Sequence, residues 1–81
     1  MWIKYRSILV NSEKLDDIYI NKETKNLNAT VNTMSGERIY TFAYNKEYNI
    51  DKLYAKLVEA LTTNKVLFDI NKQLDCKLYA D

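Results

Sequence analysis

The chain has 81 residues, a formal net charge of +1 and hydrophobic residues at 47% of positions. This length indicates one domain, and the hydrophobic content excludes a wholly disordered chain. The sequence has no histidine, one cysteine and one glycine. These counts exclude histidine metal sites, Ser-His-Asp and Cys-His catalytic groups, thiolate zinc clusters and glycine-rich phosphate loops. We therefore predict a protein that is not an enzyme and holds no metal or cofactor.

The N-terminal residues predict strands joined by short turns. Met1–Val10 predicts one strand with apolar residues on both parities, which is typical of a strand covered on both faces or lying in an oligomer contact. Alternation along this strand assigns its apolar residues to two faces, Ile3, Tyr5 and Leu9 on one and Trp2, Ile8 and Val10 on the other. A polar turn at Asn11–Asp17 then leads to a short strand at Ile18–Ile20.

Two more strands follow a charged hairpin tip at Asn21–Asn26. Leu27–Asn32 alternates apolar and polar residues, which predicts a half-buried strand. Gly36 supplies the positive φ of the next turn, and Arg38–Tyr44 predicts the fourth strand. One parity of this strand carries a bulky, largely aromatic set, consisting of Arg38, Tyr40, Phe42 and Tyr44. Water solvates such a face poorly, so we expect it to be covered.

Residues 50–63 predict the only helix with an unambiguous period. Its apolar residues recur at i, i+3, i+4, i+7, i+8 and i+11, namely Ile50, Leu53, Tyr54, Leu57, Val58 and Leu61. Asn49 is a favourable N-cap, and Asp51 suits the positive end of the helix dipole. This stripe predicts a helix that covers one face of a sheet.

The two segments after the helix each allow two predictions of secondary structure. Val66–Ile70 predicts either a fifth strand or a segment packed against the sheet. Residues 71–81 form a tail that is either a short helix or frayed. The predicted fold class is α+β, with one domain over residues 1–70. It is an antiparallel meander of four to five strands, covered on one face by the helix at residues 50–63.

The candidate binding residues combine basic and aromatic side chains from two predicted strands. They are Lys4, Arg6, Arg38, Tyr40, Phe42 and Tyr44. Such a surface can stack bases and hold phosphates, as single-strand nucleic-acid binders do. Tyrosine and arginine are also enriched in protein interfaces, and the net charge is close to neutral. The pattern therefore favours a self-interface or protein-binding surface over a nucleic-acid site.

Two other features carry weaker signals. The adjacent carboxylates Asp16 and Asp17 could bind a divalent cation, but further oxygen ligands are missing nearby, so a solvated turn is the better interpretation. Cys76 lies near the C-terminus with Lys77 as its only adjacent basic residue, which favours an unreactive thiol. Neither feature changes the prediction of a non-enzymatic protein.

The order of these patterns resembles a group of known proteins. The chain opens MWIKYRSILVNSEKLDDIYI, continues with a four-strand pattern, and ends its helix with ALTTNKVLFDI. It thereby resembles short, uncharacterised intracellular proteins of low-GC Gram-positive bacteria and their phages, over about residues 1–70. The resemblance implies a compact α+β module of mobile-element origin. It implies no activity and supplies no site residues.

We predict a cytoplasmic binding protein, since the sequence shows no transmembrane run and no signal peptide. The leading hypothesis is a phage-encoded inhibitor or sequestering protein that acts against a host defence system. The alternative is a single-stranded nucleic-acid or nucleotide-binding module that uses the basic and aromatic strand face. The expected partners are a second copy of the chain, because so short a domain gains stability by oligomerising, and a host protein or a nucleotide.

Overall fold

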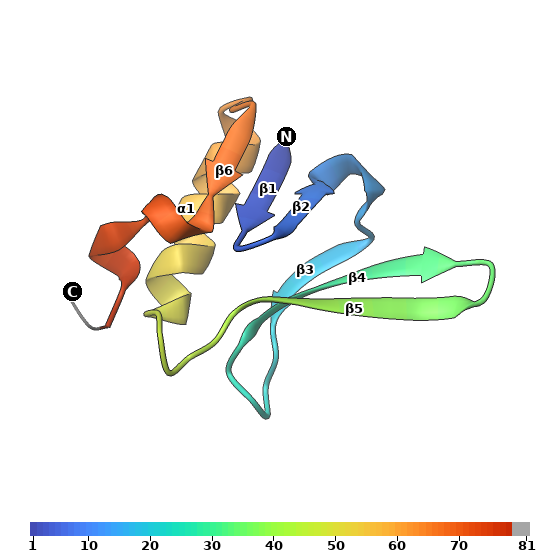
Figure 1. Cartoon of the computed structure of the whole chain (residues 1–81), viewed down its shortest axis with the longest axis horizontal. Coiled ribbons are helices and arrows are strands. Elements are labelled where there is room, and N and C mark those ends of the chain that lie inside the picture. Colours follow the sequence, from blue (N-terminus) through green and yellow to red (C-terminus); the bar gives the residue numbers. More distant parts are fainter. Residues whose placement is uncertain (79–81) are drawn as a thin grey trace.

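The computed structural model describes residues 1–78 and contains six strands and one α-helix. The strands form two three-stranded sheets, ordered β2-β1-β6 in sheet A and β3-β4-β5 in sheet B (Figure 1). Their bounds are β1 Trp2–Tyr5, β2 Ile8–Asn11, β3 Asp17–Ile20, β4 Leu27–Thr33, β5 Gly36–Ala43 and β6 Leu67–Asp69. The helix α1 spans Ile50–Thr62. The α+β class is confirmed, and the prediction of one meandering sheet is wrong.

The first departure from the prediction is a chain reversal inside Met1–Val10. Arg6 has a φ of 54°, and the chain turns there so that β1 and β2 pair as antiparallel strands. Arginine rarely adopts this left-handed conformation, so the usual turn signals of glycine or asparagine are absent. The two-residue turn also shifts the side-chain alternation, and Ile8 and Val10 join Ile3 and Tyr5 on the inner face of sheet A.

The second departure is a pairing between the two ends of the chain. β6 lies beside β1 in parallel, with Ile3 opposite Phe68. Of the two alternatives for Val66–Ile70, the structure shows a strand, β6 at Leu67–Asp69. Its Phe68 side chain is buried, so the strand also contributes to the core. Because a parallel neighbour needs a long crossover connection, β6 cannot belong to a meander with β1.

Sheet B follows the predicted meander. β3 and β4 are antiparallel, as are β4 and β5. β3 pairs with β4 only from Leu27 to Thr30, so the rest of the β4–β5 hairpin is two-stranded and extends away from the body (Figure 1). The pairing of β4 with β5 is irregular at Leu27 and Asn28, where Leu27 lies opposite Ala43 and Asn28 opposite Thr41.

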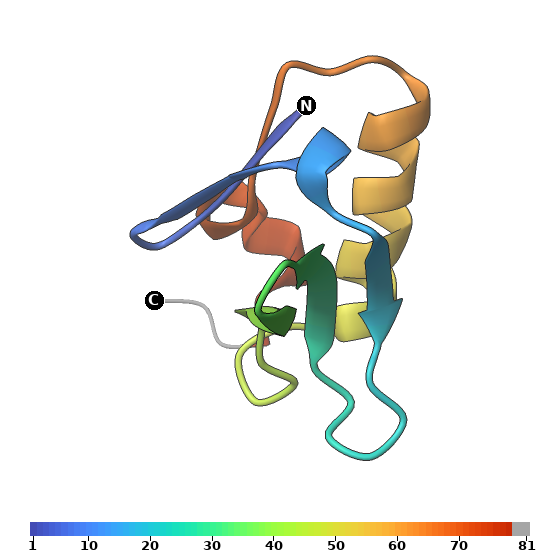
Figure 2. The same cartoon turned by 90° about the vertical axis from the view of Figure 1, so that its right-hand side faces the viewer.

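The core lies between the two sheets and α1, and Figure 2 shows α1 running alongside β3. The Asn49 side chain caps the helix by accepting a hydrogen bond from the Lys52 N–H at 3.2 Å. The residues of the helix that are buried are Ile50, Leu53, Leu57 and Ala60. Two residues of the predicted stripe, Val58 and Leu61, stay partly exposed because the packed face centres on Leu53 and Leu57.

The C-terminal residues continue to pack after β6. Two short 3-10 turns, η2 at Ile70–Lys72 and η3 at Leu74–Cys76, follow, and both Ile70 and Cys76 are fully buried. The Cys76 carbonyl accepts a hydrogen bond from the Asn49 N–H at 2.7 Å, which ties this segment to the start of α1. The remainder of the predicted tail, residues 79–81, lies outside the described residues. Within residues 1–78, no helix has the length and apolar character needed to cross a membrane.

Candidate functional site

The six residues predicted from the sequence to form one surface belong to two different sheets. Lys4 and Arg6 lie on and just after β1, in sheet A, whereas Arg38, Tyr40 and Phe42 lie on β5, in sheet B. The sixth residue, Tyr44, follows β5 and is partly exposed. Lys4 and Arg6 are therefore on a different sheet from Arg38, Tyr40 and Phe42. The charge of Tyr5, followed by those of Glu47 and Tyr44, raises the pKa of the Arg6 guanidinium, so Tyr44 lies close to Arg6.

The aromatic pair on β5 belongs largely to the core. Phe42 is fully buried. The Tyr40 ring stacks on it, with 6.1 Å between ring centroids and 9° between ring planes, and is half-buried. Tyr40 remains partly accessible, but the Phe42 ring cannot contact a ligand without opening the core.

Arg6 is engaged within the chain. Its Nη2 donates to both carboxylate oxygens of Glu47, at 3.0 and 2.8 Å. Its guanidinium also lies 5.1 Å from the centroid of the Tyr5 ring. Burial, followed by the charge of Glu47, raises the pKa of Tyr5. These contacts join the β1–β2 turn to the segment before α1, which indicates a structural role for Arg6.

The paired carboxylates and the thiol also have structural roles. The Asp16 carboxylate accepts a hydrogen bond from the Asn32 N–H at 2.6 Å, and the Asp17 carboxylate accepts one from the Thr30 hydroxyl at 3.4 Å. Among residues 1–78, no cluster of three or more His, Cys, Asp or Glu side chains is placed to hold a metal ion. Burial, followed by the charge of Asp75, raises the pKa of the Cys76 thiol, which keeps it protonated near neutral pH.

The outer face of sheet A presents the exposed apolar surface that the sequence-based residue set missed. Pairing places Trp2 between Asn11 of β2 and Leu67 of β6. Two residues further along β1, Lys4 lies between Leu9 of β2 and Asp69 of β6. We use "outer face" below for these six residues, Trp2, Lys4, Leu9, Asn11, Leu67 and Asp69.

Three of the outer-face residues are large, apolar and about half exposed. Trp2, Leu9 and Leu67 expose 44%, 57% and 48% of their surface. Their strand neighbours on the inner face, including Ile3 and Phe68, are buried. Sheet A is therefore apolar on both faces, and within residues 1–78 only the inner face is packed. Asn11 lies beside Trp2, and Lys4 lies between Leu9 and Asp69, so the outer face combines large apolar side chains with polar ones, as protein interfaces do.

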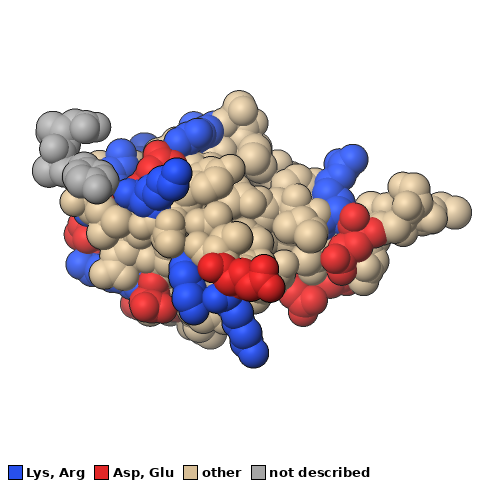
Figure 3. All heavy atoms as spheres, turned by 90° about the horizontal axis from the view of Figure 1, so that it is seen from below, with Lys and Arg blue, Asp and Glu red and all other residues tan. Residues whose placement is uncertain are grey.

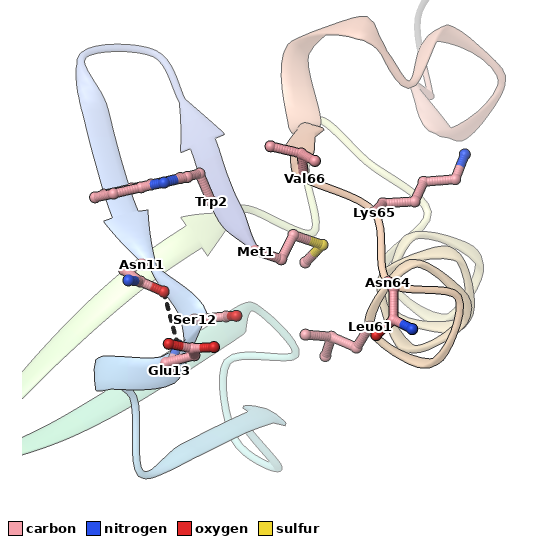
Figure 4. Close-up of a pocket in the computed structure, with 9 residues that line it drawn as sticks. All are labelled: Met1, Trp2, Asn11, Ser12, Glu13, Leu61, Asn64, Lys65 and Val66. Atoms are coloured by element: carbon pink, nitrogen blue, oxygen red, sulfur yellow. Dashed lines mark hydrogen bonds between the residues drawn. The ribbon is translucent and has the colours of Figure 1, made fainter.

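A shallow hollow of about 540 Å³ adjoins the outer face. Trp2 and Asn11 line it from sheet A, and Leu61, Lys65 and Val66 line it from the end of α1 and the segment after it (Figure 4). Figure 4 shows the Trp2 indole extending from β1 toward β2, with Leu61 across the hollow. The hollow mixes apolar side chains with Lys65 and the carboxylate of Glu13, so it offers no concentration of one charge.

Comparisons with protein-family models, with curated proteins and with solved structures find no match. Function must therefore be argued from the surface itself. Figure 3 shows lysine and arginine side chains interspersed with aspartate and glutamate on the face of the molecule seen from below. This face carries no extended basic area of the kind that a nucleic-acid backbone requires.

The sequence contained a signal for the outer face, but the residues of Met1–Val10 were not all assigned to the correct face. Apolar residues on both parities of Met1–Val10 predicted a strand covered on two sides or lying in a contact. Recognising the reversal at Arg6 would have placed Leu9 with Trp2 instead of with Ile3. Leu67 joins them through pairing between distant parts of the chain, which local patterns do not reveal.

Proposed function

We propose that the chain is a non-enzymatic binding protein that acts by covering an apolar surface of another protein with its outer face. The biological role that we propose is that of a phage-encoded inhibitor or sequestering protein directed at a host defence protein. Small size supports this role, because covering a surface requires an interface and no catalytic groups. The resemblance to short phage and bacterial proteins supplies the proposed biological setting.

The observation that carries the proposal is the exposure of Trp2, Leu9 and Leu67 together on one sheet face. Exposed apolar residues scattered singly are ordinary, whereas a contiguous group rimmed by polar residues marks an interaction site. Tryptophan is among the residues that contribute most to binding when it lies near the centre of an interface. Trp2 lies on β1, the middle strand of sheet A, with a neighbour on each side.

The nature of the partner follows from the charges around these residues. The outer face contains one cation, Lys4, and one anion, Asp69, on adjacent strands. A nucleic acid would instead favour several unpaired cations along its backbone. A protein surface with its own apolar centre is thus the better complement. The alternative of nucleic-acid or nucleotide binding has less support, because Phe42 is buried and Arg6 is paired with Glu47.

A phage-plating assay tests the proposed role. Bacterial strains that each carry one antiphage defence system are made to express the chain and are then challenged with a phage that this system blocks. We expect plaque formation to be restored on at least one strain. Failure on every strain of a broad panel, with the protein accumulating to normal levels, would contradict the anti-defence role.

Matched substitutions connect the activity to the outer face. Trp2→Ser and Leu67→Ser should each abolish the restored plating, because both remove apolar area from the proposed contact. Val58→Ser is the control, since Val58 is also partly exposed and apolar but lies on α1. Full activity in Trp2→Ser and Leu67→Ser would show that the outer face is not the binding surface.

A further inference from the structure

The strand β5 forms a long free edge of sheet B. It pairs with β4 on one side, and no strand within residues 1–78 pairs with its other side. Edge strands expose unpaired N–H and C=O groups that can add a further strand. The edge runs along the projecting two-stranded part of the hairpin, where an additional strand meets no obstruction from sheet A (Figure 1).

The backbone direction at Ile39 follows from its partner on β4. The Thr30 carbonyl accepts a hydrogen bond from the Asp16 N–H at 2.8 Å, so the backbone groups of Thr30 point toward β3. Ile39 lies opposite Thr30. In an antiparallel pair, residues opposite each other direct their backbone groups either toward each other or both away. Ile39 therefore directs its N–H and C=O away from β4, toward the free edge.

The exposed apolar side chains of this region are spaced symmetrically about Ile39. Ile39 exposes 56% of its surface, and Met34 at the hairpin tip is fully exposed. Tyr44 is also exposed. Met34 and Tyr44 lie five residues before and five residues after Ile39. A segment with this symmetry complements an antiparallel copy of itself, because the tip of one copy reaches the Tyr44 end of the other.

We propose that two copies of the chain pair through the β5 edge, antiparallel, about a two-fold axis at Ile39. In this register Ile39 lies opposite Ile39 of the second copy. Arg38 lies opposite Tyr40, where its guanidinium can approach the half-buried ring. Glu37 lies opposite Thr41, and Met34 approaches Tyr44. The two sheets B then form one continuous six-stranded sheet.

Registers with the axis at Arg38, Glu37 or Thr41 are less favourable. An axis at Arg38 would place two arginines directly opposite each other, and like charges in that position are destabilising. An axis at Glu37 would oppose two glutamates. An axis at Thr41 would extend the pairing across Phe42 and Ala43, where the β4–β5 register is irregular. The axis at Ile39 avoids opposed like charges and keeps its central pairs within the regular part of β5.

The dimer has a clear physical benefit for this chain. A two-stranded ribbon is only marginally stable in water, and the second copy gives the projecting part of the hairpin further hydrogen-bonded neighbours. A chain of this length buries a smaller fraction of its unfolded surface than a larger domain does, so added burial of Ile39 and Met34 stabilises it. The proposed contact leaves the outer face of sheet A free, and it does not depend on the function proposed above.

Cysteine cross-linking tests the register. An antiparallel hydrogen-bonded pair has Cα atoms about 5.5 Å apart, which is within the range that a disulfide spans. Ile39→Cys should therefore form a disulfide-linked dimer rapidly on oxidation. Glu37→Cys is the matched control on the same face of the strand, because its equivalent Cα atoms would be about 14 Å apart. The native Cys76 is buried and should give no cross-link in the unsubstituted chain.

The solution mass gives a second, independent readout. Sedimentation velocity should show a dimer for the native chain. Ile39→Lys should weaken association by roughly tenfold or more, because it opposes two cations and removes apolar contact. Val66→Lys, a change at an exposed apolar residue remote from β5, should remain dimeric. A native chain that stays monomeric at millimolar concentration would overturn the proposal, as would preferential cross-linking of Arg38→Cys or unaltered association of Ile39→Lys.

Discussion

Trp2 and Leu67 lie directly opposite each other on adjacent strands of sheet A, and each leaves about half of its surface exposed. They come from opposite ends of the chain and meet only because β6 pairs in parallel with β1. The same pairing places Ile3 opposite Phe68 on the buried side. One strand pair therefore supplies both a core contact and the central contact of the proposed binding surface.

Truncation of two adjacent residues of β1, Trp2 and Ile3, should lower the free energy of unfolding to different extents. Ile3→Ala should lower the free energy of unfolding by about 2–5 kcal/mol, because Ile3 is fully buried. Trp2→Ser should lower it by less than Ile3→Ala, because Trp2 keeps 44% of its surface exposed. Urea unfolding followed by far-UV circular dichroism measures both. A large loss in Trp2→Ser would mean that Trp2 is a structural residue and not a binding residue.

Phe42 should behave as a core residue even though the first half of β5 is exposed. Phe42→Ala should lower the free energy of unfolding by about 3–5 kcal/mol, since it removes a fully buried ring and its stacking on Tyr40. Tyr40→Ala should cost less, because Tyr40 is only half-buried. Equal and small losses in the two variants would contradict the placement of Phe42 in the core.

The ion pairs of Asp75 with Lys52 and Lys56 should stabilise the fold less as the solution becomes acidic. A hydrogen bond from Lys56 lowers the pKa of Asp75, and Lys52 Nζ lies 3.6 Å from the same carboxylate oxygen. Because the folded-state pKa is depressed, the stabilisation is present above the ordinary value of 3.8 and is lost as the pH falls through the lowered value. The difference in unfolding free energy between the native chain and Asp75→Asn should therefore shrink below pH 3.8. An unchanged difference down to pH 2 would show that the pair is broken in solution.

Cys76 should be protected from thiol reagents in the folded chain. Its side chain is fully buried and its pKa is raised by that burial, so both access and ionisation are limited. Labelling with Ellman's reagent should be slow in buffer and fast in urea. The raised pKa also means that the thiol stabilises the fold below its ordinary value of 9.0, with the contribution lost as the pH rises through the raised value. Rapid labelling of the folded chain would contradict this description.

Features of the fold that depend on neighbouring residues were predictable from the sequence. The 3.6-residue period and the Asn49 cap predicted a helix at residues 50–63, and α1 spans Ile50–Thr62. Alternation and turn residues likewise predicted the strands of sheet B and the turn before Gly36. These signals are local, so they need no knowledge of how distant segments meet.

The two sheets and the outer face could not be obtained in this way. The reversal after Tyr5 uses an arginine with positive φ, which carries no turn signal in the sequence. The pairing of β1 with β6 joins distant segments, and its stability comes from packing instead of propensity. On β5, the aromatic alternation marked a face to be covered, but Phe42 is covered by the core itself.

The central claim is that the outer face stays free while the chain associates with itself through β5. Trp2 is the only tryptophan and lies on that face, so its fluorescence reports on it directly. Acrylamide quenching of Trp2 should be measured across the concentration range in which sedimentation shows the dimer forming. We predict equal quenching at all concentrations. Loss of quenching as the dimer forms would contradict the claim, because it would show that self-association covers the outer face.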